Sequence, residues 1–211
     1  MMNPESLAQT GEARITAEEA APLEEAAWRM GTWGLLATLL RREPDQAVLD
    51  RVAAFAEMDG SGPELQVALA SLGLAAASSS PEAVSDEFHD LFIGIGRGEL
   101  LPYGSWYQTG FLMERPLSLL REDLRRLGYA REEGNAEPED HVAALCEVMA
   151  LMIQDQRPEA EQAAFYDRHV RDWMGRFFED LGNAESAVFY RSVGRLGSAF
   201  LAIESAGFDL Q

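Results

Sequence analysis

The apolar residues of the C-terminal half recur with the period of an α-helix, and this pattern constrains the fold more than any other feature. Within residues 138–156, apolar side chains nearly encircle the expected helix, which is typical of a helix buried on all sides. The segments on either side are amphipathic, with apolar residues three and four positions apart. We therefore expect a helical bundle with residues 138–156 at its centre. The encircling positions are Val142, Leu145, Cys146, Val148, Met149, Met152 and Ile153.

Breaks rich in Gly, Ser, Pro and Asp divide the rest of the chain into further helices. The expected helices span residues 22–42, 45–58, a segment ending at 72, 81–93, 113–127, 138–156, 158–181 and 189–203. Gly128 marks the end of the fifth of these. No segment alternates polar and apolar residues between turn signals. The fold class is therefore all-α, a single-domain bundle of about eight to ten helices with no sheet. Residues 1–20 are expected to form a flexible tail, and residues 21–211 the domain.

The charge balance limits the kinds of partner. The chain has 36 acidic and 17 basic residues and a formal net charge of −19. Nucleic acid is a poor partner, because phosphate binding depends on clustered Lys and Arg. An anionic membrane surface is disfavoured for the same reason. A basic peptide or protein face is the better electrostatic match, although the charge could equally serve only solubility.

Cysteine content and hydropathy set further limits. Cys146 is the only cysteine, so neither an internal disulfide nor a Cys-rich metal site is expected. Residues 1–21 are polar and show no basic start followed by an apolar stretch. The longest apolar run, residues 142–153, is interrupted by Glu147 and is too short to span a bilayer. A cytoplasmic location without stable membrane insertion is the expectation.

Three patterns suggest catalytic or cofactor chemistry, and their context argues against each. Gly94-x-Gly96-x-Gly98 follows a helix rather than a strand and lacks the lysine of a phosphate-binding loop. The histidines His89, His141 and His169 do not have metal-ligand spacing. Ser105, Asp140 and His141 could be drawn as a triad, but Asp140 and His141 are sequence neighbours and no nucleophile elbow is present. We predict no catalytic residue, cofactor or metal. A small nucleotide-binding protein or hydrolase using Ser105 and His141 remains the alternative from another class.

Residues 94–108 form a long irregular stretch, expected to be ordered because Tyr103, Trp106 and Tyr107 lie within it. Asp140 and His141 are predicted to occupy the first turn of the central helix, where a carboxylate complements the helix dipole. The complete account could be that Asp140 only caps the helix and that His141 bonds a neighbouring loop. Alternatively, the acidic helix start and the aromatic stretch form a binding site. Residues 132–161 contain nine acidic residues and one basic residue, which suits an arginine-bearing apolar peptide.

Several motifs, in order, resemble the TorD/DmsD family of chaperones and its NarJ-like relatives. The family carries a Phe/Tyr-x-x-Leu-Phe stretch, a glycine loop, Pro-Tyr-x-Ser-x-Tyr, and Glu-Pro-x-Asp-His at a helix start. This chain has Phe88-His89-Asp90-Leu91-Phe92, Gly94-Ile95-Gly96, Pro102-Tyr103-Gly104-Ser105-Trp106-Tyr107 and Glu137-Pro138-Glu139-Asp140-His141. The resemblance covers roughly residues 28–203. Many members carry Glu at the position of Gly104, so this chain departs from the pattern there.

The resemblance implies an all-helical, non-enzymatic, cytoplasmic chaperone. Its partners would be the apo catalytic subunit of a molybdoenzyme of the DMSO-reductase superfamily and that subunit's twin-arginine signal peptide. Binding would aid cofactor insertion before export. By the same resemblance, the peptide-binding residues would be Tyr103, Ser105, Trp106, Tyr107, Glu137, Asp140 and His141. A NarJ-like chaperone for a non-exported subunit is the alternative within the family. Such bundles can exchange helices between copies, so a monomer or a domain-swapped homodimer is expected.

Overall fold

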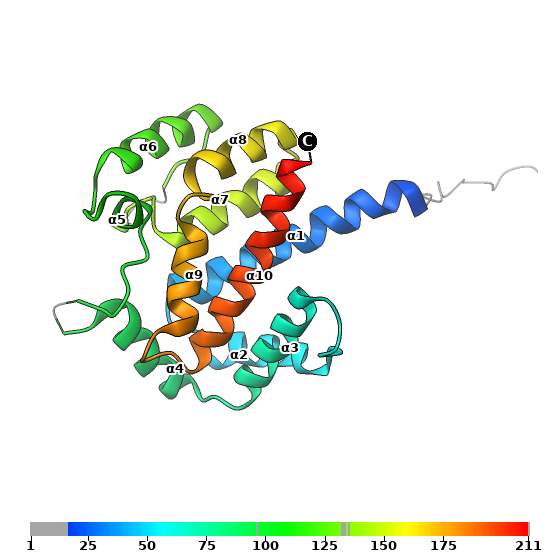
Figure 1. Cartoon of the computed structure of the whole chain (residues 1–211), viewed down its shortest axis with the longest axis vertical. Coiled ribbons are helices and arrows are strands. Elements are labelled where there is room, and N and C mark those ends of the chain that lie inside the picture. Colours follow the sequence, from blue (N-terminus) through cyan, green and yellow to red (C-terminus); the bar gives the residue numbers. More distant parts are fainter. Residues whose placement is uncertain (1–16, 96, 132–133, 135, 211) are drawn as a thin grey trace, which may run out of the picture.

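The computed structural model describes residues 17–95, 97–131, 134 and 136–210, and these residues form ten α-helices (Figure 1). The described residues form no sheet, and their one isolated β-bridge joins Tyr103 to His141. The all-α prediction is confirmed. The α-helices are α1 (Ala17–Arg41), α2 (Gln46–Ala53), α3 (Glu64–Ala77), α4 (Pro81–Phe88), α5 (Gly104–Thr109), α6 (Arg115–Leu127), α7 (Val142–Gln154), α8 (Glu159–His169), α9 (Met174–Asn183) and α10 (Phe189–Asp209).

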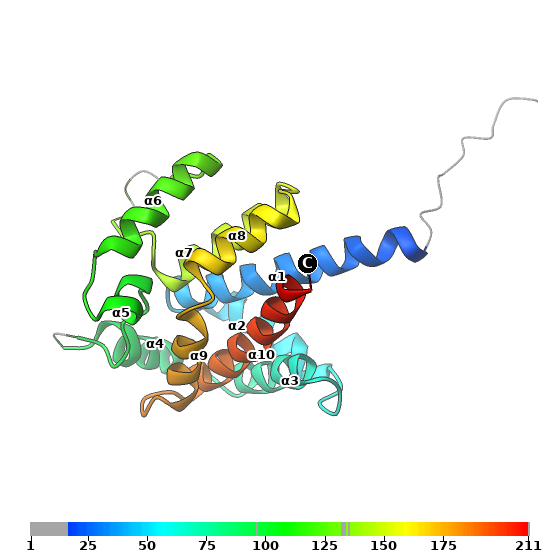
Figure 2. The same ribbon diagram turned by 45° about the horizontal axis from the view of Figure 1, so that its top comes forward.

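Helix α7 is the buried helix that the encircling apolar pattern predicts. Val142, Cys146, Met149 and Met152 have no exposed surface. Helix α1 packs along α7, and α10 packs against both α9 and α3. Figures 1 and 2 show the N-terminal end of α1 extending beyond the other helices. The buried apolar side chains form one continuous core cluster that draws on helices from both ends of the chain.

The N-terminal helix boundaries differ from the predicted ones. Helix α1 begins at Ala17 rather than at residue 22, and α3 continues to Ala77 rather than ending near 72. The expected helix 45–58 is divided into α2 and a 3₁₀ turn, Ala54–Glu57, against which α3 packs. The expected helix 81–93 ends as a π-helical turn, His89–Ile93. The predicted tail spans residues 1–20, of which residues 17–20 belong to α1. Residues 1–16 lie outside the described residues, as does Gly96 of the glycine motif.

Three corrections fall near the candidate site. Residues 94–108 are not wholly irregular, because Gly104–Thr109 forms α5. The central helix begins at Val142 instead of residue 138, so Asp140 precedes it rather than lying in its first turn. The helix expected over 158–181 is two helices, α8 and α9, separated at residues 170–173. Val170 and Trp173 are buried within that break, so the apolar pattern continues across it.

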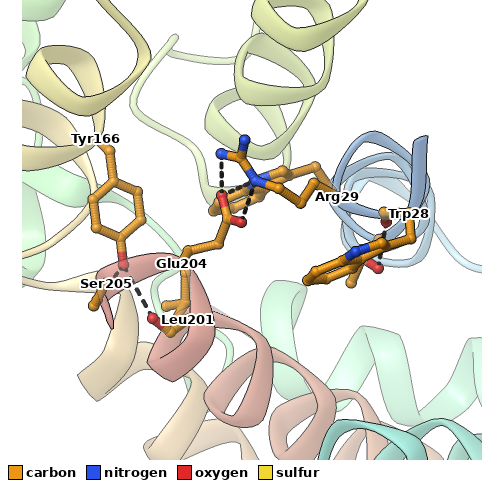
Figure 3. A network of polar contacts seen from close by, with 8 residues as sticks. Trp28, Arg29, Tyr166, Leu201, Glu204 and Ser205 are labelled. Atoms are coloured by element: carbon orange, nitrogen blue, oxygen red, sulfur yellow. Dashed lines mark hydrogen bonds and ion pairs between the residues drawn. The ribbon is translucent and has the colours of Figure 1, made fainter. Parts of the chain in front are cut away.

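Two buried carboxylates hold distant segments together. The Glu87 carboxylate accepts hydrogen bonds from the backbone N–H groups of Val188, Phe189 and Tyr190, at 2.8, 2.9 and 2.7 Å. It thereby satisfies the free donors at the start of α10. The Glu204 carboxylate of α10 receives Arg29 Nε at 2.6 Å, which ties α10 to α1 (Figure 3). Both ties join residues more than one hundred positions apart.

Among the described residues no single helix is long and apolar enough to cross a membrane. The segments Glu64–Ala77 and Pro81–Ile93 meet those criteria only when taken together, and they are bent by 113° at the break between them.

Candidate functional site

The Pro-Tyr-Gly-Ser motif and the Asp-His motif are joined directly by backbone hydrogen bonds. Gly104 N–H donates to the carbonyl of Asp140 at 2.9 Å, and Val142 N–H donates to the carbonyl of Pro102 at 2.8 Å. Between these bonds lies the antiparallel bridge of Tyr103 with His141. Their rings meet edge to face, with centroids 5.2 Å apart. Two motifs that are far apart in the sequence therefore form one structural unit beside the start of α7.

Asp140 and His141 have exchanged the roles expected of them. His141 is the N-cap of α7, and its Nδ1 accepts a hydrogen bond from Ala143 N–H at 3.2 Å. Asp140 instead bonds the neighbouring segment, because its Oδ2 accepts from Ser105 N–H at 2.8 Å in the first turn of α5. Asp140 is only 3% exposed, so this bond is shielded from water. The aspartate therefore stabilises the start of α5 rather than the start of α7.

Asp140 also keeps one oxygen without a partner. Its Oδ1 is buried and makes no hydrogen bond to any described residue. The residue lines a pocket of about 330 Å³ that α5, α6 and His169 also border. His169 is itself engaged, since its Nε2 lies 2.8 Å from Asp123 Oδ2. Burial lowers the pKa of His169, which keeps its imidazole neutral at pH 7.

Ser105 is a buried structural residue. Its side chain is 0% exposed, and its hydroxyl oxygen accepts a hydrogen bond from Met113 N–H at 3.2 Å. Met113 has a positive φ of 61°, unusual for a residue with a side chain, so the bond helps to hold the turn between α5 and α6. A hydroxyl enclosed in this way cannot reach a substrate from solvent.

Gly104, where this chain departs from the resemblance, lies against Trp173. A Cβ atom placed on Gly104 would lie 3.2 Å from atoms of the Trp173 indole ring. The ring is buried, and its Nε1–H donates to the carbonyl of His169 at 2.7 Å. A larger side chain at residue 104 would therefore require a buried and hydrogen-bonded tryptophan to shift.

The side chains of Tyr103 and Glu137 are bonded to each other. The Tyr103 hydroxyl donates to Glu137 Oε1 at 2.5 Å. Burial, reinforced by this bond, raises the pKa of Tyr103, so the phenol stays protonated at pH 7. The pair links the loop before α7 to the segment before α5.

Trp106 and Tyr107 have partners outside the loop before α7. The Arg97 guanidinium carbon lies 5.2 Å from the centroid of the Trp106 ring. The Tyr107 ring packs against Trp173, with centroids 5.6 Å apart, and its hydroxyl donates to Asp180 at 2.8 Å. These two aromatic residues contact Arg97 and the α9 region rather than the loop before α7. The seven predicted residues therefore do not converge on one surface.

A pocket of about 640 Å³ lies between the end of α1, α6, the loop before α7 and one face of α7. Its floor is partly apolar, and three carboxylates and two arginines contribute to its walls. Glu147 of α7 forms an ion pair with Arg41 of α1. Glu139 is paired with Arg121 of α6 at 2.8 Å. The lining residues are Arg41, Leu124, Tyr129, Ala130, Arg131, Gly134, Glu137, Pro138, Glu139, His141, Ala143, Ala144, Glu147, Val148 and Leu151.

Of the seven predicted site residues, only Glu137 and His141 line this pocket, with Tyr103 bonded to Glu137 beside it. Sequence reasoning missed Arg41 and Glu147. The sequence does carry a signal for Glu147, because it is the one charged residue within an apolar helix. Arg41 gave no such indication, since a basic residue at the end of a helix is ordinary.

The described residues contain no group of three or more His, Cys, Asp or Glu side chains arranged to hold a metal ion. Cys146 is fully buried, and burial raises the pKa of its thiol, which disfavours the reactive thiolate. The lining of the pocket can offer hydrogen bonds, charge and apolar surface to a ligand.

We expect His141 to titrate far below an ordinary histidine. Burial lowers the pKa of His141 to about 4, against the opposing effect of the charges on Glu137 and Asp140. Because this value lies below the unfolded value near 6.5, the stability that His141 contributes is present above pH 6.5. It is lost as the pH falls toward 4.

An NMR titration of the imidazole resonances, assigned with His141→Gln, measures this pKa directly. In denaturation experiments the wild type should lose stability relative to His141→Gln between pH 6.5 and 4. An inflection near pH 6.5 for His141 would show that the ring is solvated, against the structure.

Comparisons with known proteins support the resemblance. The chain is 31% identical over 126 residues to the chaperone protein TorD of Vibrio cholerae (strain ATCC 39541), covering 54% of this chain and 57% of that protein. It thus spans little more than half the length of that relative. A second chaperone protein TorD, from Vibrio vulnificus (strain YJ016), is 27% identical over 192 residues, covering 81% of this chain and 89% of its own.

A crystal structure of a candidate redox enzyme maturation protein from Archaeoglobus fulgidus has the same fold, with a TM-score of 0.59 at 20% identity. The match covers 82% of this chain and 93% of that one. The sequence model of the nitrate reductase delta subunit family matches residues 59–179. That segment includes α3 to α8 and most of the pocket lining, and it is more than half of the chain. The chain therefore belongs to the nitrate reductase delta subunit family, in agreement with the TorD- and NarJ-like resemblance of its motifs.

Proposed function

We propose that the protein is a non-enzymatic maturation chaperone of the cytoplasm. It binds the apo form of a molybdoenzyme of the DMSO-reductase superfamily, its twin-arginine signal peptide, or both, before cofactor insertion and export. Family membership and the relatives named as chaperones support the general role. The 640 Å³ pocket with carboxylates in its walls is the single observation that carries the peptide-binding role.

The pocket suits a peptide in which arginines adjoin an apolar stretch. Leu124, Val148 and Leu151 supply apolar surface, whose burial contributes roughly 25 cal/mol per Å² before ordering costs. Glu137, Glu139 and Glu147 supply the acceptors that a guanidinium binds through two parallel hydrogen bonds. The net charge of −19 favours the approach of a basic peptide.

In this proposal the predicted site residues have different tasks. Glu137 and His141 contact the peptide, and Tyr103 holds Glu137 in position. Ser105 and Asp140 are positioning residues, since both are buried and fix α5 against the start of α7. Trp106 and Tyr107 are candidates for contacts with another part of the client.

We expect Glu147→Gln to weaken binding of a synthetic twin-arginine signal peptide about two- to fivefold, the effect of one exposed ion pair. Isothermal calorimetry at low and moderate salt measures the affinity. Glu122→Gln is the matched control, because it removes the same charge from an exposed position on α6 that does not line the pocket. A peptide with both arginines replaced by glutamine should bind the wild type and Glu147→Gln with equal affinity. Equal weakening by both variants would mean that the pocket is not the binding site.

A hydrolase using Ser105 and His141 is the less favoured proposal. The Ser105 hydroxyl is enclosed and accepts a hydrogen bond from Met113 N–H. His141 Nδ1 is committed to the start of α7. A screen of ester and nucleotide hydrolysis with purified protein tests this proposal, and turnover lost in His141→Ala would support it.

The description of the matching family favours a second candidate within the chaperone class. In this alternative, a NarJ-like chaperone would serve a catalytic subunit that is not exported. The two candidates differ in whether the client begins with a twin-arginine signal. Binding to a purified apo-client with and without its leader separates them, since only the first candidate loses affinity when the leader is removed.

A further inference from the structure

Arg41 brings a guanidinium of the chain's own into the pocket. It is the last residue of α1, and α1 packs along α7. Its Nη2 donates to Oε2 of Glu147. The side chains of Arg41 and Glu147 remain 40% and 51% exposed, so water reaches the ion pair. The pocket therefore already contains the group that a peptide arginine would present.

The fold does not depend on this pair. Helix α1 is anchored by buried apolar residues, among them Trp33, Leu36 and Leu39. Solvent-exposed ion pairs contribute little to stability, so Arg41 and Glu147 can separate at small cost. The ordinary alternative is that Arg41 only complements the C-terminal end of the α1 dipole and fastens α1 to α7.

Arg41 also acts electrostatically on the pocket beyond Glu147. Its positive charge contributes to the lowered pKa of His141. A cation arriving in the pocket must therefore approach both a carboxylate that is already paired and a resident positive charge.

We infer that Arg41 is an internal competitor, which occupies Glu147 in the empty pocket and must be displaced by an arginine of the bound peptide. The inference rests on the proposed peptide-binding function and adds a limit on the affinity to it. An incoming guanidinium can replace Arg41 with a bidentate contact, whereas a lysine ammonium offers only a point charge. Because either peptide must displace Arg41, the competition lowers the affinity for both by the same factor, and any preference for arginine comes from its bidentate contact.

The test is calorimetry of Arg41→Gln with twin-arginine and twin-lysine peptides. We expect about two- to fivefold tighter binding of the arginine peptide, the effect of one exposed ion pair. The ratio of the affinities for the arginine and lysine peptides should stay unchanged, because Arg41 competes with both. In the Glu147→Gln background, Arg41→Gln should no longer tighten peptide binding, because the carboxylate for which Arg41 competes is absent.

Arg42→Gln is the matched control for net charge, since Arg42 is the adjacent exposed arginine and does not line the pocket. Thermal unfolding of each variant confirms that the fold is retained. NMR titration of His141 without peptide should show a higher pKa in Arg41→Gln, as expected when a neighbouring positive charge is removed.

The outcomes separate the inference from the function on which it rests. If the wild type binds the arginine peptide and Arg41→Gln binds it equally or less tightly, the competitor role is overturned and the proposed function stays in place. An equal gain in Arg42→Gln also overturns it, since net charge alone would then explain the effect. Absence of arginine-dependent binding in the wild type and all variants overturns both.

Discussion

Replacing Glu204 by alanine is expected to lower the free energy of unfolding by about 3–5 kcal/mol, because it leaves the buried Arg29 guanidinium without its counter-charge. Arg29 is 9% exposed and Glu204 3% exposed. Two Arg29 nitrogens donate to the two carboxylate oxygens at 2.6 and 2.9 Å, as Figure 3 shows. Trp33 Nε1–H donates to the same carboxylate at 2.9 Å and would also lose its acceptor.

The measurement is chemical denaturation followed by circular dichroism, with Glu179→Ala as the control at an exposed position on α9. The double variant Arg29→Met, Glu204→Leu should recover part of the loss, because apolar replacements remove the desolvation penalty of both charges while Trp33 Nε1–H still lacks its acceptor. A loss below about 1 kcal/mol for Glu204→Ala would show that Arg29 reaches water when its partner is absent.

The helices were largely predictable because their apolar period is a local property of the sequence. Helix α7 was expected from its encircling apolar positions, and these are buried. The end of α6 was expected at Gly128, which adopts the left-handed conformation with a φ of 84°. Both conclusions depend on residues within a few positions of one another.

Helix α5 and the break between α8 and α9 were missed because long-range contacts determine them. Residues 104–109 contain no helix period of their own, and their first turn is held by Asp140, 35 positions away. The break at 170–173 contains neither glycine nor proline, and the apolar pattern continues through it. In both places tertiary packing overrides the local preference.

The candidate site was predictable only in part, for a related reason. Motifs place Tyr103 and Glu137 near the start of α7, and the structure joins their side chains. Sequence order does not say which way consecutive side chains face. In the structure Tyr107 points toward α9, whereas Ser105 points into the interior. Arg41 comes from a helix about one hundred positions away, and only the fold brings it to Glu147.

Glu87 directly precedes the Phe88–Phe92 motif, yet its importance follows only from the structure. Its carboxylate accepts three backbone N–H groups at the start of α10, and a buried donor left unsatisfied is costly. We expect Glu87→Ala to lower the free energy of unfolding by about 2–4 kcal/mol, since hydrogen bonds to charged groups contribute more than neutral ones.

Glu87→Gln should fall between the wild type and Glu87→Ala, because its amide retains one acceptor oxygen but presents an NH₂ group to backbone donors. Asp86→Ala, at the adjacent exposed position of α4, controls for the loss of a negative charge. Denaturation measures all three, and hydrogen exchange shows where stability is lost. Faster exchange confined to the first turn of α10 would mean that Glu87 acts only as a local cap. Faster exchange that extends through α10 into α9 would mean that the cap supports the packing of the two helices, as their extensive contact leads us to expect.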